Sequence, residues 1–128
     1  MVVNPHFSFP PSPSFPASSD GVRLVGVRGE LDIATVPELE SALDWVFAPE
    51  GRPLVVLDML AVTFLDCAIV RPLLHARSTA LSRGGALSLV CGPTPVRRLL
   101  RQLSLERHLV NYGTMAAALA APPHRPQR

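Results

Sequence analysis

The chain has 128 residues, 48% of them hydrophobic and only 5% aromatic, so we expect one domain with a core built mainly from Leu, Val and Ala. All twelve basic residues are arginines, and the formal net charge of +2 is too small to predict a nucleic-acid-binding surface. The sequence has no stretch of eighteen apolar residues and no basic region near its start, which predicts a cytoplasmic protein without a membrane span or targeting signal.

The two cysteines, Cys67 and Cys91, lack the paired spacing of a zinc site. A reducing cytosol would keep them as free thiols. We therefore expect no disulfide, no metal and no cofactor.

Residues 1–20 form a proline-rich arm. The segment 5–16 alone holds five prolines and three phenylalanines, so it cannot donate a regular ladder of backbone hydrogen bonds. We expect a loosely attached arm with a short edge strand near Phe7, and a proline-rich ligand for another domain is the alternative.

The first expected strand runs from Val22 to Val27 and is followed by a turn over residues 29–32. A capping box of Thr35 and Glu38 then opens a helix over 36–47, where apolar residues recur at helical spacing.

An unbroken apolar run over 54–57 predicts a central parallel strand that is covered on both faces. Asp66 is the expected N-cap of a second helix, which Gly84 and Gly85 end after about Ser82. Because Pro72 would fall inside that helix, we expect a kink there or a helix that starts later than Cys67.

The last third of the chain predicts a strand over 86–91, a helix that Thr94 caps and Pro95 begins, and a short strand at Leu109 and Val110. Thr114 can cap a final helix that ends near Ala120, and residues 121–128 are expected to be disordered. The alternation of strands and helices over residues 21–120 predicts an α/β domain with a mostly parallel sheet.

Cys67 is the candidate nucleophile, because the first turn of a helix favours a thiolate. We favour inert packing of a buried thiol instead, since no His or Lys lies near Cys67 in the sequence. His75 likewise has no partner acid at the spacing of a catalytic triad, and we expect it on the surface or in packing.

Three aspartates end up near the termini of neighbouring elements, but without a phosphate-binding motif they are weak evidence for a metal site. Asp66 is explained as a cap and Asp58 as a strand-end residue that faces water. For Asp32 a partner contact and an Asx-type turn remain equally open. The arginines at 97, 98 and 101 share one face of the third helix, which we interpret as a solvated face.

Four segments in this order and spacing resemble the STAS domain of bacterial anti-sigma factor antagonists: GELDIAT at 29–35, VTFLD at 62–66, GGALSLV at 84–90 and PVRRLL at 95–100. The resemblance covers about residues 21–120. It implies a four- or five-stranded sheet with four helices. It also implies a non-enzymatic protein that binds an anti-sigma factor, often a serine kinase of the histidine-kinase-like ATPase fold, and so regulates sigma-factor-dependent transcription.

In that family the kinase inactivates its antagonist by phosphorylating the serine directly after the aspartate equivalent to Asp66. Here the position holds Cys67, followed by Ala68 and Ile69. The resemblance therefore implies a partner-binding surface without the usual phosphoswitch, in a monomer or weak dimer. Its expected contacts are Asp32, Thr35, Asp66, Cys67, Ala68 and Ile69. A redox sensor or phosphoryl-transfer protein that uses Cys67 is the alternative function.

Overall fold

The computed structural model describes residues 7–8, 21–92 and 95–120. The expected tail, most of the proline-rich arm and the Thr94 cap lie outside these residues. The elements in chain order are β1 (Phe7–Ser8), β2 (Val22–Leu31), α1 (Val36–Phe47), β3 (Leu54–Leu65), the 3-10 turn η1 (Cys67–Ile69), α2 (Val70–Ser82), β4 (Ala86–Val90), α3 (Pro95–Gln102), the 3-10 turn η2 (Leu105–Arg107), β5 (Val110–Tyr112) and α4 (Met115–Ala120).

The five strands form one sheet in the order β1-β2-β3-β4-β5. Strands β2 to β5 run parallel, and β1 lies antiparallel on the edge, where Phe7 is opposite Val27. The predicted α/β fold with a mostly parallel sheet, and the predicted edge strand near Phe7, are therefore confirmed.

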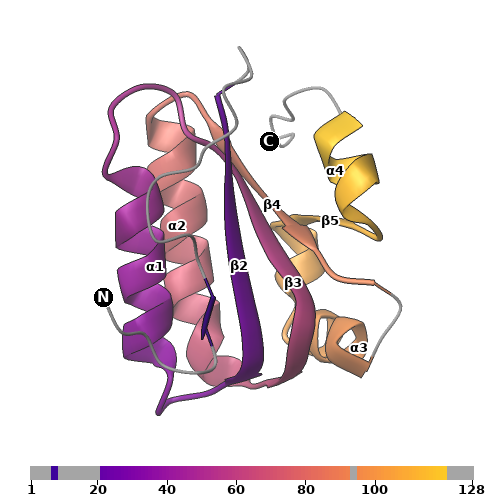
Figure 1. The fold of residues 1–128 in the computed structure, drawn as a ribbon. Helices are drawn as coiled ribbons and strands as arrows, with labels where there is room; N and C mark the ends of the chain where they lie inside the picture. Colours follow the sequence, from indigo (N-terminus) through magenta and orange to yellow (C-terminus); the bar gives the residue numbers. More distant parts are fainter. Residues whose placement is uncertain (1–6, 9–20, 93–94, 121–128) are drawn as a thin grey trace.

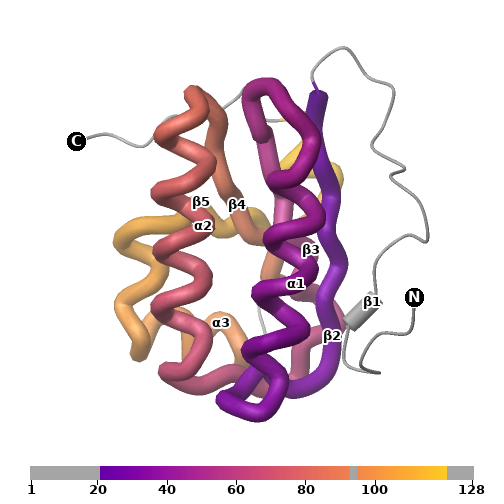
Figure 2. The backbone as a smooth tube through the Cα atoms, turned by 90° about the vertical axis from the view of Figure 1, so that its left-hand side faces the viewer, coloured from indigo at the N-terminus to yellow at the C-terminus, as the bar shows by residue number. Residues whose placement is uncertain are grey.

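Helices α1 and α2 lie side by side against one face of the sheet, and α4 lies on the other side (Figure 1). Figure 2 shows the two long helices from the front, with β2 and β3 behind them. The main core lies between these helices and the sheet and is lined by side chains such as Leu39, Leu57 and Leu73, which have no exposed surface. Because Val56 packs with Ala118 on the opposite face, the central strand is covered on both sides, as its apolar run predicts.

Strands β2 and β3 are longer than predicted, because both continue through bulges. Gly29 has φ of +81° and lies in β2 at a register shift. The predicted turn over residues 29–32 is therefore wrong for residues 29–31, which belong to the strand. In β3, Asp58 accepts a hydrogen bond of 2.9 Å from the backbone N–H of Leu60, which stabilises a second irregularity. Asp58 is thus inside β3 and not at its end.

Of the two alternatives, a kink at Pro72 or a helix that starts later than Cys67, the structure confirms the later start. The turn η1 occupies residues 67–69, and α2 begins at Val70. Pro72 therefore lies in the first turn of α2, where its missing N–H costs no helical hydrogen bond.

The two glycines that end α2 have different physical roles. Gly84 has φ of +77°, which closes the helix in the left-handed conformation that favours glycine. Gly85 has no room for a side chain, because an added Cβ would overlap the carbonyl of Pro53. The predicted helix end is confirmed.

Two arginines bind the carboxyl end of α1. Arg23 is only 6% exposed and donates hydrogen bonds to the carbonyls of Val46 (3.0 Å) and Glu50 (2.9 Å). Arg83 donates to the carbonyls of Phe47 and Pro49, each at 2.6 Å, and to that of Gly51 at 3.0 Å. Burial and then the charge of Arg83 lower the pKa of Arg23. The sequence prediction of a strand from Val22 to Val27 did not include this contact.

The carboxyl-terminal third largely follows the prediction. Pro95 begins α3, and Thr114 accepts a hydrogen bond of 3.1 Å from the N–H of Ala117 in α4. Strand β5 starts at Val110, one residue later than expected.

Candidate functional site

Two loops meet where β2 and β3 end. Leu31 and Leu65 are paired in the parallel register of these strands, and the backbone N–H of Asp66 donates to the carbonyl of Leu31 at 3.2 Å. Asp32 and Asp66 thus follow equivalent positions of neighbouring strands, whose backbones lie about 4.8 Å apart. The structure thus brings these two predicted site residues together at the carboxyl ends of β2 and β3.

Asp66 orients the start of the helical segment that follows β3. Its Oδ1 accepts a hydrogen bond of 2.8 Å from the N–H of Ala68, while its own backbone is extended. The predicted N-cap is confirmed, although the element it caps is η1 rather than α2.

Asp32 holds the other loop through an Asx-type turn. Its Oδ1 accepts from the N–H groups of Ala34 (3.0 Å) and Thr35 (3.2 Å), and its own N–H donates to the hydroxyl of Thr35 at 2.9 Å. The Thr35 hydroxyl in turn donates to the carbonyl of Glu30 at 3.0 Å. The carboxylate of Asp32 therefore has a structural task in this loop.

The predicted capping box is wrong. Thr35 precedes α1 but makes no side-chain cap hydrogen bond, since its hydroxyl is used by the Asp32 turn. Glu38, the expected reciprocal partner, has a buried Oε1 without a hydrogen-bond partner among the described residues. The reciprocal hydrogen-bond partner of Thr35 is therefore Asp32 and not Glu38.

Cys67 is exposed at the first position of η1, which corrects the expectation of a buried thiol. Cys91 is buried, and the two cysteines are not joined in a disulfide.

The six expected contact residues differ in exposure. Cys67 is exposed, and Asp32, Asp66 and Ala68 are half-buried. Thr35 is only 5% exposed and Ile69 has no exposed surface, so neither side chain fits the expectation of a partner contact. Ile69 packs in the main core beneath η1.

Two apolar side chains near these loops are exposed, and sequence analysis did not single them out. Ile33, in the Asp32 turn, is 77% exposed, and Phe64, next to the end of β3, is 42% exposed. The signal for Ile33 was present, since it is the one large apolar residue in the turn between β2 and α1. With Cys67, they are exposed side chains near the carboxyl ends of β2 and β3.

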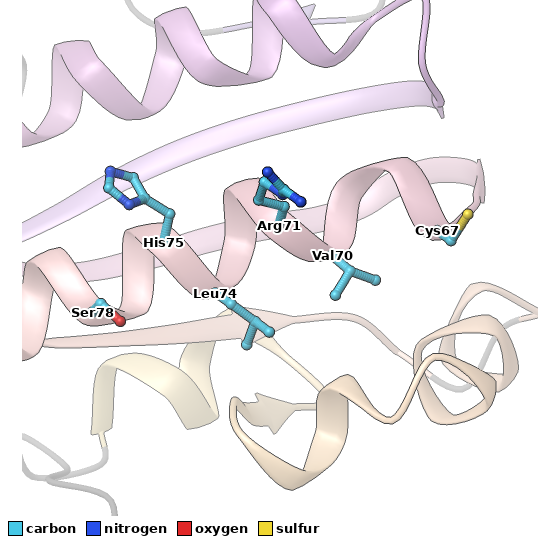
Figure 3. Close-up of a pocket in the computed structure, with 6 residues that line it drawn as sticks. All are labelled: Cys67, Val70, Arg71, Leu74, His75 and Ser78. Atoms are coloured by element: carbon cyan, nitrogen blue, oxygen red, sulfur yellow. The ribbon is translucent and has the colours of Figure 1, made fainter.

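Cys67 also lies at one end of a shallow hollow of about 550 Å³ along the exposed side of α2 (Figure 3). Arg71, His75 and Ser78 contribute its polar lining, and Val70 and Leu74 its apolar part. Figure 3 shows Arg71 and His75 on the edge of α2 nearest α1, and Leu74 on the opposite edge.

The other residues considered from sequence are on the surface. The three arginines of α3 are exposed, and two of them, Arg97 and Arg101, lie 3.4 and 3.8 Å from the carboxylate of Glu106. Their interpretation as a solvated face is consistent with this exposure. Within residues 7–8, 21–92 and 95–120, no three His, Cys, Asp or Glu residues are grouped as metal ligands would be, and none of the helices could cross a membrane.

Similar proteins agree with this architecture. The anti-sigma-F factor antagonist RsfB of Mycobacterium tuberculosis, strains H37Rv and CDC 1551, is 28% identical over 103 residues, which are 80% of this chain and 83% of that protein. A crystal structure of an anti-sigma factor antagonist from Mycobacterium paratuberculosis superposes with a TM-score of 0.69 at 29% identity, over 80% of this chain and 86% of that one.

A crystal structure of a Thermotoga maritima protein has a TM-score of 0.68 at 23% identity, over 82% of this chain and 91% of that one, and supports the fold alone. The match to the STAS domain family covers residues 17–119, most of the chain. With the predicted sheet and the two loops at its carboxyl edge in place, the chain belongs to the STAS domain family.

Proposed function

We propose that this protein is an anti-sigma factor antagonist: it binds an anti-sigma factor through the loops 31–35 and 65–68 and so regulates sigma-factor-dependent transcription. The named function of its mycobacterial relatives supports this assignment. The single structural observation that supports the site is the direct hydrogen bond between the loops, from the N–H of Asp66 to the carbonyl of Leu31. It makes one surface from two segments.

The surface binds and performs no covalent chemistry. Asp32 and Asp66 use their carboxylates to hold backbone N–H groups, which leaves Ile33, Phe64 and Cys67 as the exposed side chains for a partner. Apolar side chains within a polar surround are typical of the centre of a protein interface. We place the protein in the cytoplasm, as a monomer or weak dimer.

The partner proposed here is an anti-sigma factor of the serine-kinase type, but the complex is not switched by phosphate. Cys67 occupies the position at which such a kinase would modify serine, and a thiol does not accept phosphate from a serine kinase. Because no phosphate is added at this exposed position, phosphorylation there does not change the charge of the docking surface.

The experiment is a titration calorimetry measurement with a purified ATPase-fold anti-sigma factor from the same genome. Wild type is expected to bind, Ile33→Asp to lose about tenfold or more in affinity because it buries a charge, and Arg98→Glu, exposed on α3, to stay within about twofold. No binding by wild type, or equal binding by Ile33→Asp, would contradict the proposal.

A second assay addresses the phosphoswitch. Incubation with the same kinase and ATP is expected to leave wild type unmodified and to phosphorylate Cys67→Ser on the new hydroxyl, with loss of binding. Phosphate on wild type at another hydroxyl would show that a switch exists elsewhere.

One observation favours the alternative function, a redox sensor: Cys67 is exposed at the start of a helical turn. Alkylation kinetics with iodoacetamide test it, with Cys67→Ser as the control that leaves only buried Cys91. A labelling rate equal to that of a free cysteine peptide at the same pH would exclude an activated thiol.

A further inference from the structure

A second groove lies between α1 and α2 and continues from the proposed site. Its volume is about 510 Å³, and Arg71 and His75 line both this groove and the hollow that begins at Cys67. Because the two hollows share these side chains, the exposed surface runs without interruption from η1 to the space between the helices.

The floor of the groove is apolar and its rims are charged. Leu43, Pro72 and Ala76 are buried at the base, and half-buried Phe47 adds an aromatic side chain. The α1 rim carries the carboxylates of Glu40 and Asp44, whereas the α2 rim carries Arg71 and His75, and these four side chains are exposed.

The charges on the two rims do not neutralise one another. Among the described residues, the ion pairs within 4.0 Å at Glu106 involve Arg97 and Arg101, and none joins the α1 rim of the groove to its α2 rim, so both rims remain available to a ligand. Glu40 and Asp44 on one rim are four residues apart, as are Arg71 and His75 on the other, which is about one turn of a helix.

The dimensions favour an elongated ligand. The lining of α1 extends from Glu40 to Phe47 and that of α2 from Arg71 to Thr79, which correspond to about 10 and 12 Å along the helix axes. Two turns of a third helix have this length, and a helix packs naturally into the seam of two others.

We propose that this groove binds one amphipathic helix of the anti-sigma factor, with apolar residues over Phe47, basic residues along the α1 rim and acidic residues along the α2 rim. The inference rests on the proposed function and extends its contact surface from the strand-end loops to a helix-binding groove. The opposite charges of the two rims fix the direction in which such a helix can lie.

The test exchanges the two charges without changing the net charge: Glu40→Arg combined with Arg71→Glu. The matched control exchanges exposed charges outside the groove, Glu50→Arg with Arg98→Glu. With the purified anti-sigma factor as the ligand in calorimetry, the groove exchange is expected to weaken binding by about tenfold or more, and the control by less than about twofold. Thermal unfolding of both variants near the wild-type temperature shows that the fold is intact.

The outcomes separate this inference from the proposed function. If Ile33→Asp loses binding and the groove exchange does not, the loops bind the partner and the groove proposal is overturned. If wild type does not bind, both fall. If the groove exchange changes sedimentation of the protein alone, the occupant is a second copy of the chain and the proposal is wrong; unchanged sedimentation with weakened binding supports it.

Discussion

Replacing Arg83 by alanine is expected to destabilise the domain more than the same replacement of an exposed arginine. The change removes three hydrogen bonds to the carbonyls of Phe47, Pro49 and Gly51 at the end of α1. A hydrogen bond to a charged group contributes about 1.5–3 kcal/mol, but Arg83 is half-exposed and water can replace part of the loss. The three bonds also share one side chain, so we expect a total loss of about 2–3 kcal/mol.

Urea unfolding followed by circular dichroism measures this free energy, and for a domain of about 100 residues the melting temperature should fall by about 10 °C or more. Arg83→Lys keeps the charge near the helix end but cannot reach several carbonyls from one planar group, so it should show an intermediate loss. Arg98→Ala is the control. A loss for Arg83→Ala within about 0.5 kcal/mol of this control would refute the argument.

Three further predictions follow from local geometry. Gly85→Ala should cost more than about 1 kcal/mol because its Cβ would overlap the Pro53 carbonyl, whereas Gly113→Ala, with open space around it, should cost less, both measured by urea unfolding. Asp66→Ala should lower the free energy of unfolding by about 1 kcal/mol in the same assay. Asp66→Asn should lower it much less, because the amide oxygen can still accept the hydrogen bond from the N–H of Ala68. Leu73→Ala, at a position with no exposed surface, should lower the melting temperature through a loss of about 2–5 kcal/mol; an unchanged melting temperature would mean that the core can collapse around the gap.

Elements whose signals are local could be predicted from the sequence. Helix α1 has the predicted bounds, 36–47, because its apolar residues and proline specify it without reference to the rest of the chain. The Asp66 cap and the glycines that end α2 are equally local. Such features depend on backbone groups only a few residues away.

Features that depend on distant partners could not be predicted. The carbonyls that Arg23 and Arg83 bind are exposed by the end of α1, and nothing in the residues around either arginine indicates this. The second half of β3 was missed for a related reason. Its bulges break the alternation of inward and outward side chains, so the sequence there lacks the two-residue hydrophobic period of a strand. Phe64, for example, is an apolar residue that remains exposed.

Cys67 was wrongly predicted to be buried, because the prediction relied on the usual burial of cysteine and gave less weight to its place after the Asp66 cap. Free cysteine is usually buried, but Cys67 follows the Asp66 cap at the carboxyl end of β3 and is exposed there. Position should therefore have had the greater weight here.

The same loops show that both acids of this site have structural tasks. Asp32 holds two N–H groups of its own turn and Asp66 holds one, so removing either carboxylate would alter the loop before it altered a contact. Under the proposed function, a partner would contact the exposed side chains that these loops carry, Ile33 on one loop and Cys67 on the other. We expect Cys67→Ser to keep this backbone arrangement and to add only a hydroxyl, so that binding and phosphorylation can be tested separately.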